Sequence, residues 1–320
     1  MKPTLPLHFA LFALLLLTAC VPGASPTPPS SPAPGKIRVV ATTTIVGDVV
    51  RNIGGEAIAL DVLLPINADP HSFQPTPRDA AIVSEAQVIF ANGAGLEAFL
   101  EPLLNNANSQ ARQVSVSEGI SLLAMPENHD DHEEHEGEEH EHEHAGGDPH
   151  TWIDPYNVMV WVKNIQSALS EIDPQNASLY QKNAEQYLQS LNKLDLWVRR
   201  QVDQIPQENR ILVTDHQVFG YFAARYGFEQ IGTIVPGYST LSQPSAQELA
   251  ELEDAIRALG VPTIFVGNTV NPTLAERVAN DTGTQLVFIY TGSLTDADGP
   301  APTYLDYIRF NVNALVSALK

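Results

Sequence analysis

Short apolar runs alternate with segments of helical periodicity along most of this chain. In the first half, runs rich in β-branched residues predict strands at 37–41, 60–64, 88–91 and 113–116. In the second half, similar runs predict strands at 211–214, 230–234, 263–266 and 286–289. Because strands that alternate with helices are typical of parallel sheets, the pattern predicts an α/β fold with two lobes, each a parallel β-sheet flanked by helices.

Helix start signals lie between the predicted strands. Thr76-Pro77 and Asn271-Pro272 each place a capping residue directly before a proline, which is favoured in the first turn of a helix. Ser245 and Glu248 have the spacing of a capping box. These signals predict that helices begin at all three places.

One long helical pattern separates the two predicted lobes. It opens at Asp173-Pro174, and its apolar residues recur at steps of three and four, at Tyr180, Ala184, Tyr187, Leu188, Leu191, Leu194, Val198 and Val202. A helix from Pro174 to Gln204 would be roughly 46 Å long. We therefore expect a single rigid helix to join the lobes and to allow only limited rocking between them.

The first twenty residues have the pattern of an export signal. Residues 5–19 are apolar apart from His8 and Thr18, which is shorter than the about 20 residues of a membrane span. The segment ends in Leu17-Thr18-Ala19-Cys20, which resembles a bacterial lipobox. We expect lipidation of Cys20 and an extracytoplasmic location at a bacterial membrane surface. Cys20 is the only cysteine, so the chain offers neither an internal disulfide nor a thiolate metal site.

Residues 21–35 contain six prolines among small and polar residues, a composition typical of an extended tether. We expect the folded part to begin near residue 36. The predicted organisation is a first lobe at 36–173, a linking helix at 174–207 and a second lobe at 208–320.

The formal net charge of −21 is concentrated in one place. Eleven of the 38 acidic residues lie between Glu127 and Asp148, which leaves 27 acids against 17 bases in the rest of the chain. A moderately acidic body without a basic stripe argues against nucleic acid and fits a cationic ligand.

Histidine is rare in the rest of the chain. Outside the leader and this acidic stretch it occurs only at positions 71, 150 and 216. His71 and His150 each belong to an Asp-Pro-His phrase, and His216 follows Asp215. Alone, each would be typical of a satisfied core histidine. His71, His216 and Asp296 each follow a predicted strand, so they can meet at the carboxyl ends of the sheets. Together the three histidines predict a metal site, because neutral imidazole is a common ligand for transition metals.

The acidic stretch also carries a histidine-rich tract. We expect residues 127–147 to form a disordered loop, because the composition cannot bury a core. Histidine-rich tracts are also a compositional signal for metal binding, which predicts weak accessory zinc sites at His129, His132, His135, His140, His142 and His144.

Three phrases in the chain resemble one known family. The stretches 69–78 (DPHSFQPTPR), 148–155 (DPHTWIDP) and 216–223 (HQVFGYFA) are similar to motifs of the cluster A-I solute-binding proteins of ABC importers for zinc and manganese. The resemblance runs from about residue 36 to the end. It implies two α/β lobes joined by one long helix, with a metal ion held between the lobes by four side chains. The family's four ligand positions correspond here to His71, His150, His216 and Asp296, with Asp298 as an alternative to Asp296. Asp-Ala-Asp-Gly is also a common composition for a solvated turn.

The predicted function is capture of Zn²⁺ and its delivery to an ABC permease by a monomeric, lipid-anchored binding protein that is not an enzyme. The ATPase must be a separate protein, because the chain contains no Walker A sequence. A manganese-binding member of the same family is the first alternative. A zinc hydrolase or hydratase with Asp296 as base, and an adhesin-like lipoprotein with a structural metal, are alternatives of other classes.

One glycine-rich phrase suggests a different ligand. Residues 93–98 (GAGLEA) fit the G-x-G-x-x-A fingerprint of dinucleotide binding and lie between a predicted strand and a helix. However, they follow the third strand of their lobe instead of the first. The same phrase resembles a packing segment of the family, which is the interpretation that we favour.

Overall fold

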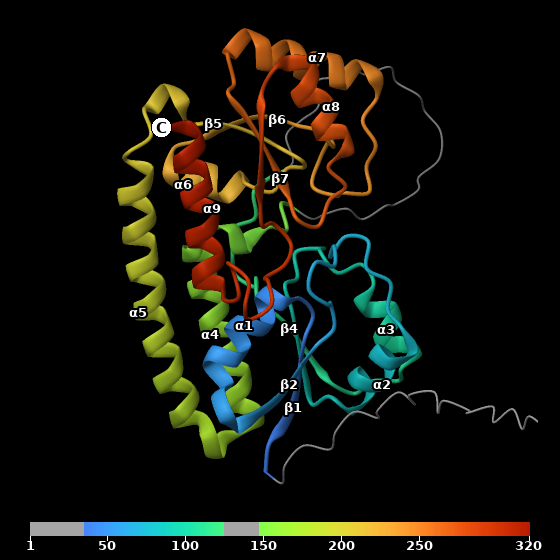
Figure 1. Ribbon diagram of the computed structural model, residues 1–320. Helices are drawn as coiled ribbons and strands as arrows, with labels where there is room; N and C mark the ends of the chain where they lie inside the picture. The colour runs from blue at the N-terminus through green and yellow to red at the C-terminus, as the bar shows by residue number, and fades with distance from the viewer. Residues whose placement is uncertain (1–34, 125–146) are drawn as a thin grey trace, which may run out of the picture. The chain divides into compact units, whose positions relative to one another are not determined.

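Two parallel four-stranded sheets form the framework of the computed structural model, which describes residues 35–124 and 147–320 (Figure 1). The first sheet has the order β2-β1-β3-β4, with strands Ile37–Ala41 (β1), Ile58–Val62 (β2), Val88–Ala91 (β3) and Arg112–Ser115 (β4). The second sheet has the order β6-β5-β7-β8, with strands Ile211–Thr214 (β5), Glu229–Thr233 (β6), Thr263–Gly267 (β7) and Gln285–Ile289 (β8). The predicted fold class is confirmed, because both lobes are parallel α/β sheets with the same strand order.

Helices cover both faces of the first sheet. They are α1 (Thr44–Gly54), α2 (Pro77–Glu85), α3 (Leu100–Asn106) and α4 (Pro155–Ile172). A separate hydrophobic cluster lies beneath α2 and α3 and includes Ile82, Val83 and Leu103. Thr76 caps α2 as predicted, since its hydroxyl accepts from the Asp79 N–H and the Asp79 carboxylate accepts from the Thr76 N–H.

The second sheet carries α6 (Gly220–Tyr226), α7 (Ala246–Leu259), α8 (Thr273–Thr282) and α9 (Tyr304–Leu319). The predicted capping box of α7 is present, with reciprocal hydrogen bonds between Ser245 and Glu248. At the start of α8, the side-chain oxygen of Asn271 accepts from the Thr273 N–H. All three predicted helix starts therefore lie within a residue or two of the observed ones.

The long helix α5 (Ala177–Val202) has 26 residues and is roughly 39 Å long. A 3₁₀ turn (Pro174–Asn176) precedes it, so the α-helix begins three residues later than the sequence predicts. Figure 1 shows α5 running alongside α4 and α9. Its buried face is the predicted one except for Leu188, which is only partly buried.

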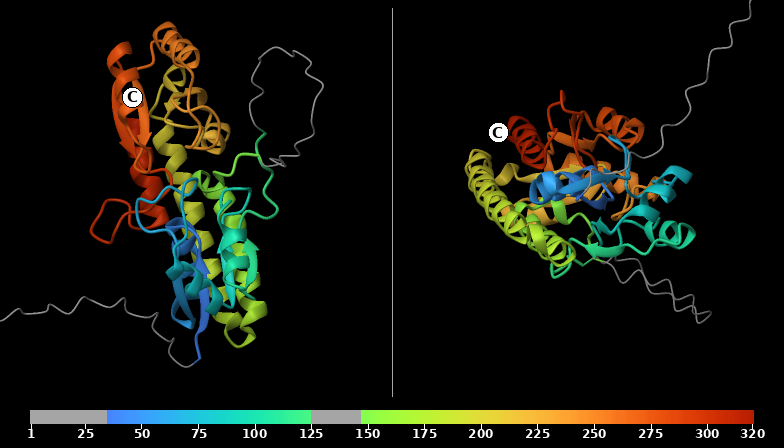
Figure 2. Two further views of the ribbon diagram at one scale, coloured as in Figure 1. Left: turned by 90° about the vertical axis from the view of Figure 1, so that its right-hand side faces the viewer. Right: turned by 90° about the horizontal axis from the view of Figure 1, so that it is seen from below.

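A single hydrophobic cluster extends through both lobes. Figure 2 shows the ribbon from two further sides, with the long helix α5 in yellow-green. The cluster contains Val39 and Phe90 from the first sheet and Leu212 and Phe265 from the second, together with residues of α1, α4, α5 and α9. The described residues accordingly belong to one compact unit. Because tightly packed interiors resist deformation, a shared core of this kind favours small movements between the lobes over wide opening.

The chain that leaves β8 is hydrogen-bonded to the first lobe. Ser293 accepts from the Asn67 N–H at 2.9 Å, and Thr44 accepts from the Leu294 N–H at 2.9 Å. The Tyr304 N–H donates to the buried Asp48 carboxylate at 3.0 Å. These contacts fix the segment after β8 against the lobe that carries His71.

The glycine-rich loop after β3 binds a carboxylate of its own chain. Glu97 accepts hydrogen bonds from the hydroxyl of Thr42 at 2.6 Å and from the N–H groups of Asn92 and Gly93 at 2.7 and 3.0 Å. Burial raises the pKa of Glu97. Two of the backbone donors that a phosphate would require are thus occupied internally, which favours the packing interpretation.

Several predictions concern residues that the structure does not describe. They are the leader with Cys20, the proline-rich tether and nearly all of the histidine-rich tract. Within residues 35–124 and 147–320, no helix combines the length and the apolar character that crossing a membrane requires.

The buried face of α5 should dominate its contribution to stability. We expect Leu191→Ala, at a position that is 0% exposed, to lower the free energy of unfolding by about 2–5 kcal/mol through a lost side chain and a cavity. Leu196→Ala, on the same helix but 56% exposed, should change it by about 0.5 kcal/mol or less. Urea denaturation of both variants tests this, and equal losses would show that the helix is not packed as described.

Candidate metal centre

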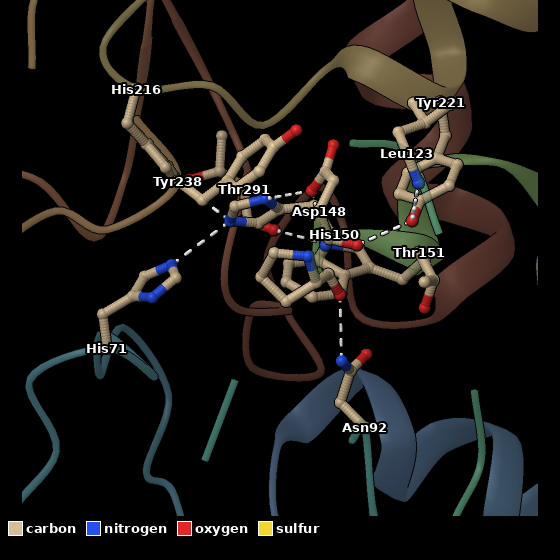
Figure 3. Close-up of polar contacts among 12 residues, drawn as sticks. His71, Asn92, Leu123, Asp148, His150, Thr151, His216, Tyr221, Tyr238 and Thr291 are labelled. Carbon is tan, nitrogen blue, oxygen red and sulfur yellow. Dashed lines mark hydrogen bonds and ion pairs between the residues drawn. The ribbon is translucent and has the colours of Figure 1, made fainter. Parts of the chain in front are cut away.

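The side chains of His71, His150 and His216 converge on one point (Figure 3). The Nε2 atoms of His71 and His150 are 3.2 Å apart, and those of His150 and His216 are 3.3 Å apart. One potential ligand atom from each ring lies within 4.8 Å of the other two. Residues separated by up to 145 positions in the sequence therefore form a single cluster of nitrogen donors.

His150 is held by the acid two residues before it. One oxygen of Asp148 accepts from the backbone N–H of His150 at 2.9 Å and from its ring Nδ1 at 2.8 Å. Both residues are completely buried, and the indole ring of Trp152 packs edge-on against the imidazole at 5.1 Å. The ring orientation is thus fixed by a hydrogen bond and by packing.

His216 directly follows the carboxyl end of β5 and is held in the same way. One oxygen of Asp215 accepts from the His216 N–H at 2.8 Å and from its Nδ1 at 2.9 Å. The other oxygen of Asp215 accepts from the Gly267 N–H at the end of β7. The strand ends of the second sheet therefore position both the acid and the imidazole.

His71 lies in the loop between β2 and α2 and is only partly buried. Its preceding acid, Asp69, does not bind the ring. One Asp69 oxygen accepts from the His71 N–H at 3.0 Å, and the other accepts from the hydroxyls of Ser72 and Thr240 at 3.1 and 2.6 Å. Since Thr240 belongs to the second lobe, Asp69 links the loop of His71 to that lobe.

The Asp–His hydrogen bonds determine which ring nitrogens carry protons. When Nδ1–H donates to a carboxylate, the neutral imidazole has an unprotonated Nε2. His150 and His216 both have this arrangement, so their Nε2 lone pairs face each other at 3.3 Å. Two such lone pairs repel one another unless a cation lies between them. The geometry is that of a cation site.

The surroundings keep the imidazoles of His71 and His150 neutral. Burial lowers the pKa of His71 to about 3, with a further contribution from the neighbouring His150 and His216. Burial and the proximity of His216 hold the pKa of His150 well below its usual value. Neutral imidazole is the form that binds metals. Because His71 and His150 are unprotonated at neutral pH, their ring nitrogens can bind a metal ion without first losing a proton.

The two supporting carboxyl groups differ in their electrostatics. Burial raises the pKa of Asp148 to about 7, partly offset by the His150 N–H and by His216. Burial acts in the same direction on Asp215, but His216 and the hydrogen bonds from His216 and Gly267 hold its pKa below the usual value. Asp215 is thus the more strongly stabilised anion. One oxygen of Asp148 has no hydrogen-bond partner among the described residues.

The histidine cluster lines a small pocket between the lobes. The other residues of its wall are Asp69, Pro70, Trp152, Val218, Thr269, Thr291 and Gly292. Further out, the hydroxyl of Tyr221 donates to the Asp148 carbonyl at 2.6 Å and accepts from the Leu123 N–H (Figure 3). This tyrosine on α6 ties the segment that carries His150 to the second lobe.

Asp296 is not brought to this cluster. It is exposed, and it lies in a turn in which its carbonyl accepts from the Gly299 N–H at 3.1 Å. A backbone hydrogen bond from Thr295 to Ala301 closes the base of that turn. Asp298 lies in the same turn and is also exposed. The solvated-turn interpretation of Asp-Ala-Asp-Gly matches this placement.

The remaining candidate residues lie in parts of the chain that the structure does not describe. These are Cys20 and the tract histidines His129, His132, His135, His140, His142 and His144. The last described residue before the tract, Ala124, accepts a hydrogen bond from the Tyr238 hydroxyl at 2.8 Å. The Tyr238 ring also lies 6.2 Å from that of His150, so the tract leaves the described chain close to the histidine cluster.

Sequence reasoning missed the different roles of the three acids. Each aspartate precedes a histidine by one or two residues, and this proximity is visible in the sequence. Nothing in the two identical Asp-Pro-His phrases shows that Asp148 binds the ring and that Asp69 does not. Thr291 and Gly292 carried no sequence signal for the site, whereas Tyr221 lies within the phrase 216–223 that resembles a family motif.

Comparison with known proteins agrees with this geometry. Residues 39–318 match the family described as "Zinc-uptake complex component A periplasmic". The manganese-binding lipoprotein MntA of Halalkalibacterium halodurans is 34% identical over 312 residues, which cover 97% of each chain. The iron-binding protein YfeA of Yersinia pestis is 31% identical over 306 residues, covering 95% of this chain and 92% of YfeA.

Among solved structures, the periplasmic zinc-binding protein TroA from Treponema pallidum superimposes with a TM-score of 0.78 at 28% identity. The match covers 89% of this chain and 99% of TroA. The names of these relatives refer to three different metals, while the fold is shared. The chain belongs to the family of zinc-uptake complex component A proteins, the metal-binding components of ABC importers.

Proposed function

We propose that this protein captures Zn²⁺ outside the cytoplasm and delivers it to the permease of an ABC importer. The observation that carries the proposal is the convergence of three Nε2 atoms, two of which Asp148 and Asp215 hold unprotonated and facing each other. The metal is cargo and takes part in no reaction, in keeping with a family of transport proteins that are not enzymes. A separate ATPase subunit would drive transport.

Lipidation of Cys20 would hold the monomeric protein at the membrane surface, close to the permease. The relatives named as lipoproteins support this part of the proposal. The histidine-rich tract would act as an accessory zinc binder, which the exit of the chain beside His150 supports.

The ligand set favours zinc. Imidazole suits zinc, whereas manganese prefers sites richer in oxygen, and manganese is the weakest binder in the Irving–Williams order. Zn–N bonds of about 2.0–2.1 Å in a tetrahedron place two nitrogens roughly 3.3–3.4 Å apart. Two of the three Nε2 separations, at 3.2 and 3.3 Å, agree with such a tetrahedron.

Manganese is the second candidate, and the relatives support it. MntA and the streptococcal PsaA proteins are named as manganese-binding, and they are similar to this chain over nearly its whole length. Against this, the acid Asp296 lies away from the three nitrogens in this chain. Zinc remains the proposal because every donor within the described cluster is an imidazole.

Metal competition tests the choice between the two. Protein purified without chelators and loaded with one equivalent of Zn²⁺ should retain it at pH 7 against a thousandfold excess of Mn²⁺. The physical reason is the weak affinity of Mn²⁺ for nitrogen donors. Elemental analysis after removal of free metal measures the outcome. Recovery of Mn²⁺ as the tightly bound metal would overturn the zinc proposal and favour the second candidate.

Removal of one imidazole should abolish tight binding without unfolding the protein. We expect His71→Ala and His216→Ala each to weaken Zn²⁺ binding at least a hundredfold, because each removes one of three converging donors. The core does not depend on either ring, so the circular dichroism of the metal-free variants should match that of the parent. Isothermal titration with a chelator competitor measures the affinity. Normal binding by either variant would contradict the ligand set.

The low pKa values of His71 and His150 predict that Zn²⁺ binding persists at acidic pH. Two imidazoles with the ordinary pKa near 6.5 would together cost roughly a hundredfold in affinity at pH 5.5. Here protons compete for these two rings only as the pH falls well below 6.5, because their pKa values are lowered. We therefore expect the affinity for Zn²⁺ to fall by less than about tenfold between pH 7.0 and 5.5. A hundredfold loss over that interval would show that the rings titrate as exposed histidines.

A further inference from the structure

His150 is the central member of the histidine cluster. Its Nε2 atom lies 3.2 Å from that of His71 and 3.3 Å from that of His216. The position of this one imidazole therefore sets two of the distances on which the proposed metal binding depends. Because His150 is completely buried, the groups that fix its backbone are themselves part of the protein interior.

The peptide group between Pro149 and His150 is hydrogen-bonded at both ends. Its N–H donates to Asp148 Oδ1 at 2.9 Å, and its carbonyl oxygen accepts from the Nδ2 of Asn92 at 2.9 Å (Figure 3). The same carbonyl oxygen accepts from the Thr151 N–H at 2.8 Å. Since a peptide group is planar, hydrogen bonds at both ends fix the direction in which the imidazole leaves the backbone.

Asn92 directly follows β3 and is a buried hydrogen-bond donor. It is 0% exposed, and its Nδ2 also donates to the Gly93 carbonyl oxygen at 2.8 Å. Its Oδ1 atom has no hydrogen-bond partner among the described residues. An unpaired buried oxygen costs free energy, which a side chain that only filled space would avoid. The donor is therefore what this position requires.

The glycine-rich phrase at 93–98 holds Asn92 in place. The carboxylate of Glu97 accepts from the N–H groups of Asn92 and Gly93, at 2.7 and 3.0 Å. Gly93 has a φ of +79°, and a Cβ atom there would overlap with Ser115 Oγ, so only glycine fits. The loop thus folds around its own carboxylate and directs the amide of Asn92 away from the loop.

Given the proposed function, we propose that Asn92 is a positioning residue for metal binding and that Glu97 acts through it. The Asn92 amide binds backbone carbonyl oxygens and leaves the imidazole nitrogens to the ion. Without this donor the Pro149–His150 peptide group can rotate, so the Nε2 atom of His150 occupies a wider range of positions. The cost falls on the metal-bound state, which requires that atom at a fixed distance from the ion.

Two substitutions of Asn92 in the full-length protein test this. Asn92→Ala removes the donor, and Asn92→Leu removes it while keeping a side chain of the same branched shape. We expect each to weaken Zn²⁺ binding by roughly tenfold or more, as the loss of supporting hydrogen bonds at metal sites commonly does. Titration with a competing chelator at pH 7 measures the affinity, and circular dichroism of the metal-free variants confirms the fold.

Asn183→Ala is the matched control. The Nδ2 of Asn183 on α5 also donates to a backbone carbonyl oxygen of the first lobe, that of Ile53, at 2.9 Å. This variant should lose stability in urea but bind Zn²⁺ within twofold of the parent. The visible d–d absorption of bound Co²⁺, which reports the geometry of its ligands, should change in the Asn92 variants and stay unchanged in Asn183→Ala.

A double-mutant cycle tests the role of Glu97. Glu97→Gln should weaken Zn²⁺ binding in the parent and cause no further loss in the Asn92→Ala background, because residues that act through one another are not additive. Additive losses would contradict an effect of Glu97 through Asn92.

Two other results would overturn the positioning role. One is a Zn²⁺ affinity within twofold of the parent in a folded Asn92 variant. The other is an equal loss of affinity in Asn183→Ala, which would indicate general destabilisation. Failure of the proposed function is distinguishable, because His216→Ala would then bind Zn²⁺ as the parent does. If only the positioning role fails, His216→Ala loses binding and the Asn92 variants keep it.

Discussion

The metal site depends on the hydrogen bonds between Nδ1–H of an imidazole and a buried carboxylate. The bond from His150 to Asp148 and the bond from His216 to Asp215 fix the tautomer, the ring orientation and the direction of the Nε2 lone pair. Such supporting partners commonly affect metal affinity by roughly ten- to a hundredfold. They also keep two buried carboxyl groups beside the site, whose charges favour a dication over an empty cluster. Without these bonds the three rings could rotate apart and relieve the repulsion between their nitrogens.

The three histidine nitrogens can converge only if the two lobes keep a fixed position relative to each other. His71 comes from the loop between β2 and α2 of the first lobe, His216 from the loop after β5 of the second lobe, and His150 from the segment before α4. The hydrophobic cluster that runs through α1, α4, α5 and α9 joins the two sheets. Near the site, hydrogen bonds such as Thr240 to Asp69 and Tyr221 to the Asp148 carbonyl add polar links between the lobes. The shared core favours a site that changes by small local movements, for which the loop of His71, the least buried of the three histidines, is best placed.

The sequence predicted the strands best where the apolar runs are largely buried. The strands at 37–41, 88–91 and 211–214 have the predicted bounds, whereas the second strand lies two residues earlier than predicted. That strand is at the edge of its sheet and exposes Asp61, while the apolar pair Leu63 and Leu64 packs just beyond it. The three histidines could be found because few others exist and each follows an acid. The placement of Asp296 was left open, because the Asp-Ala-Asp-Gly composition indicates a solvated turn whereas the family resemblance implies a metal ligand. In the structure a backbone hydrogen bond from Thr295 to Ala301 closes that turn.

The choice of metal in this family must depend on few atoms, because relatives named for manganese and iron, and a zinc-binding structural neighbour, share the same fold. The framework of two sheets and one long helix is therefore insufficient to select an ion. What can differ between such proteins is the number of imidazole and carboxylate ligands. In this chain the described donors are all imidazoles, which favours a tetrahedral ion of intermediate softness and disfavours a hard ion that needs several oxygens.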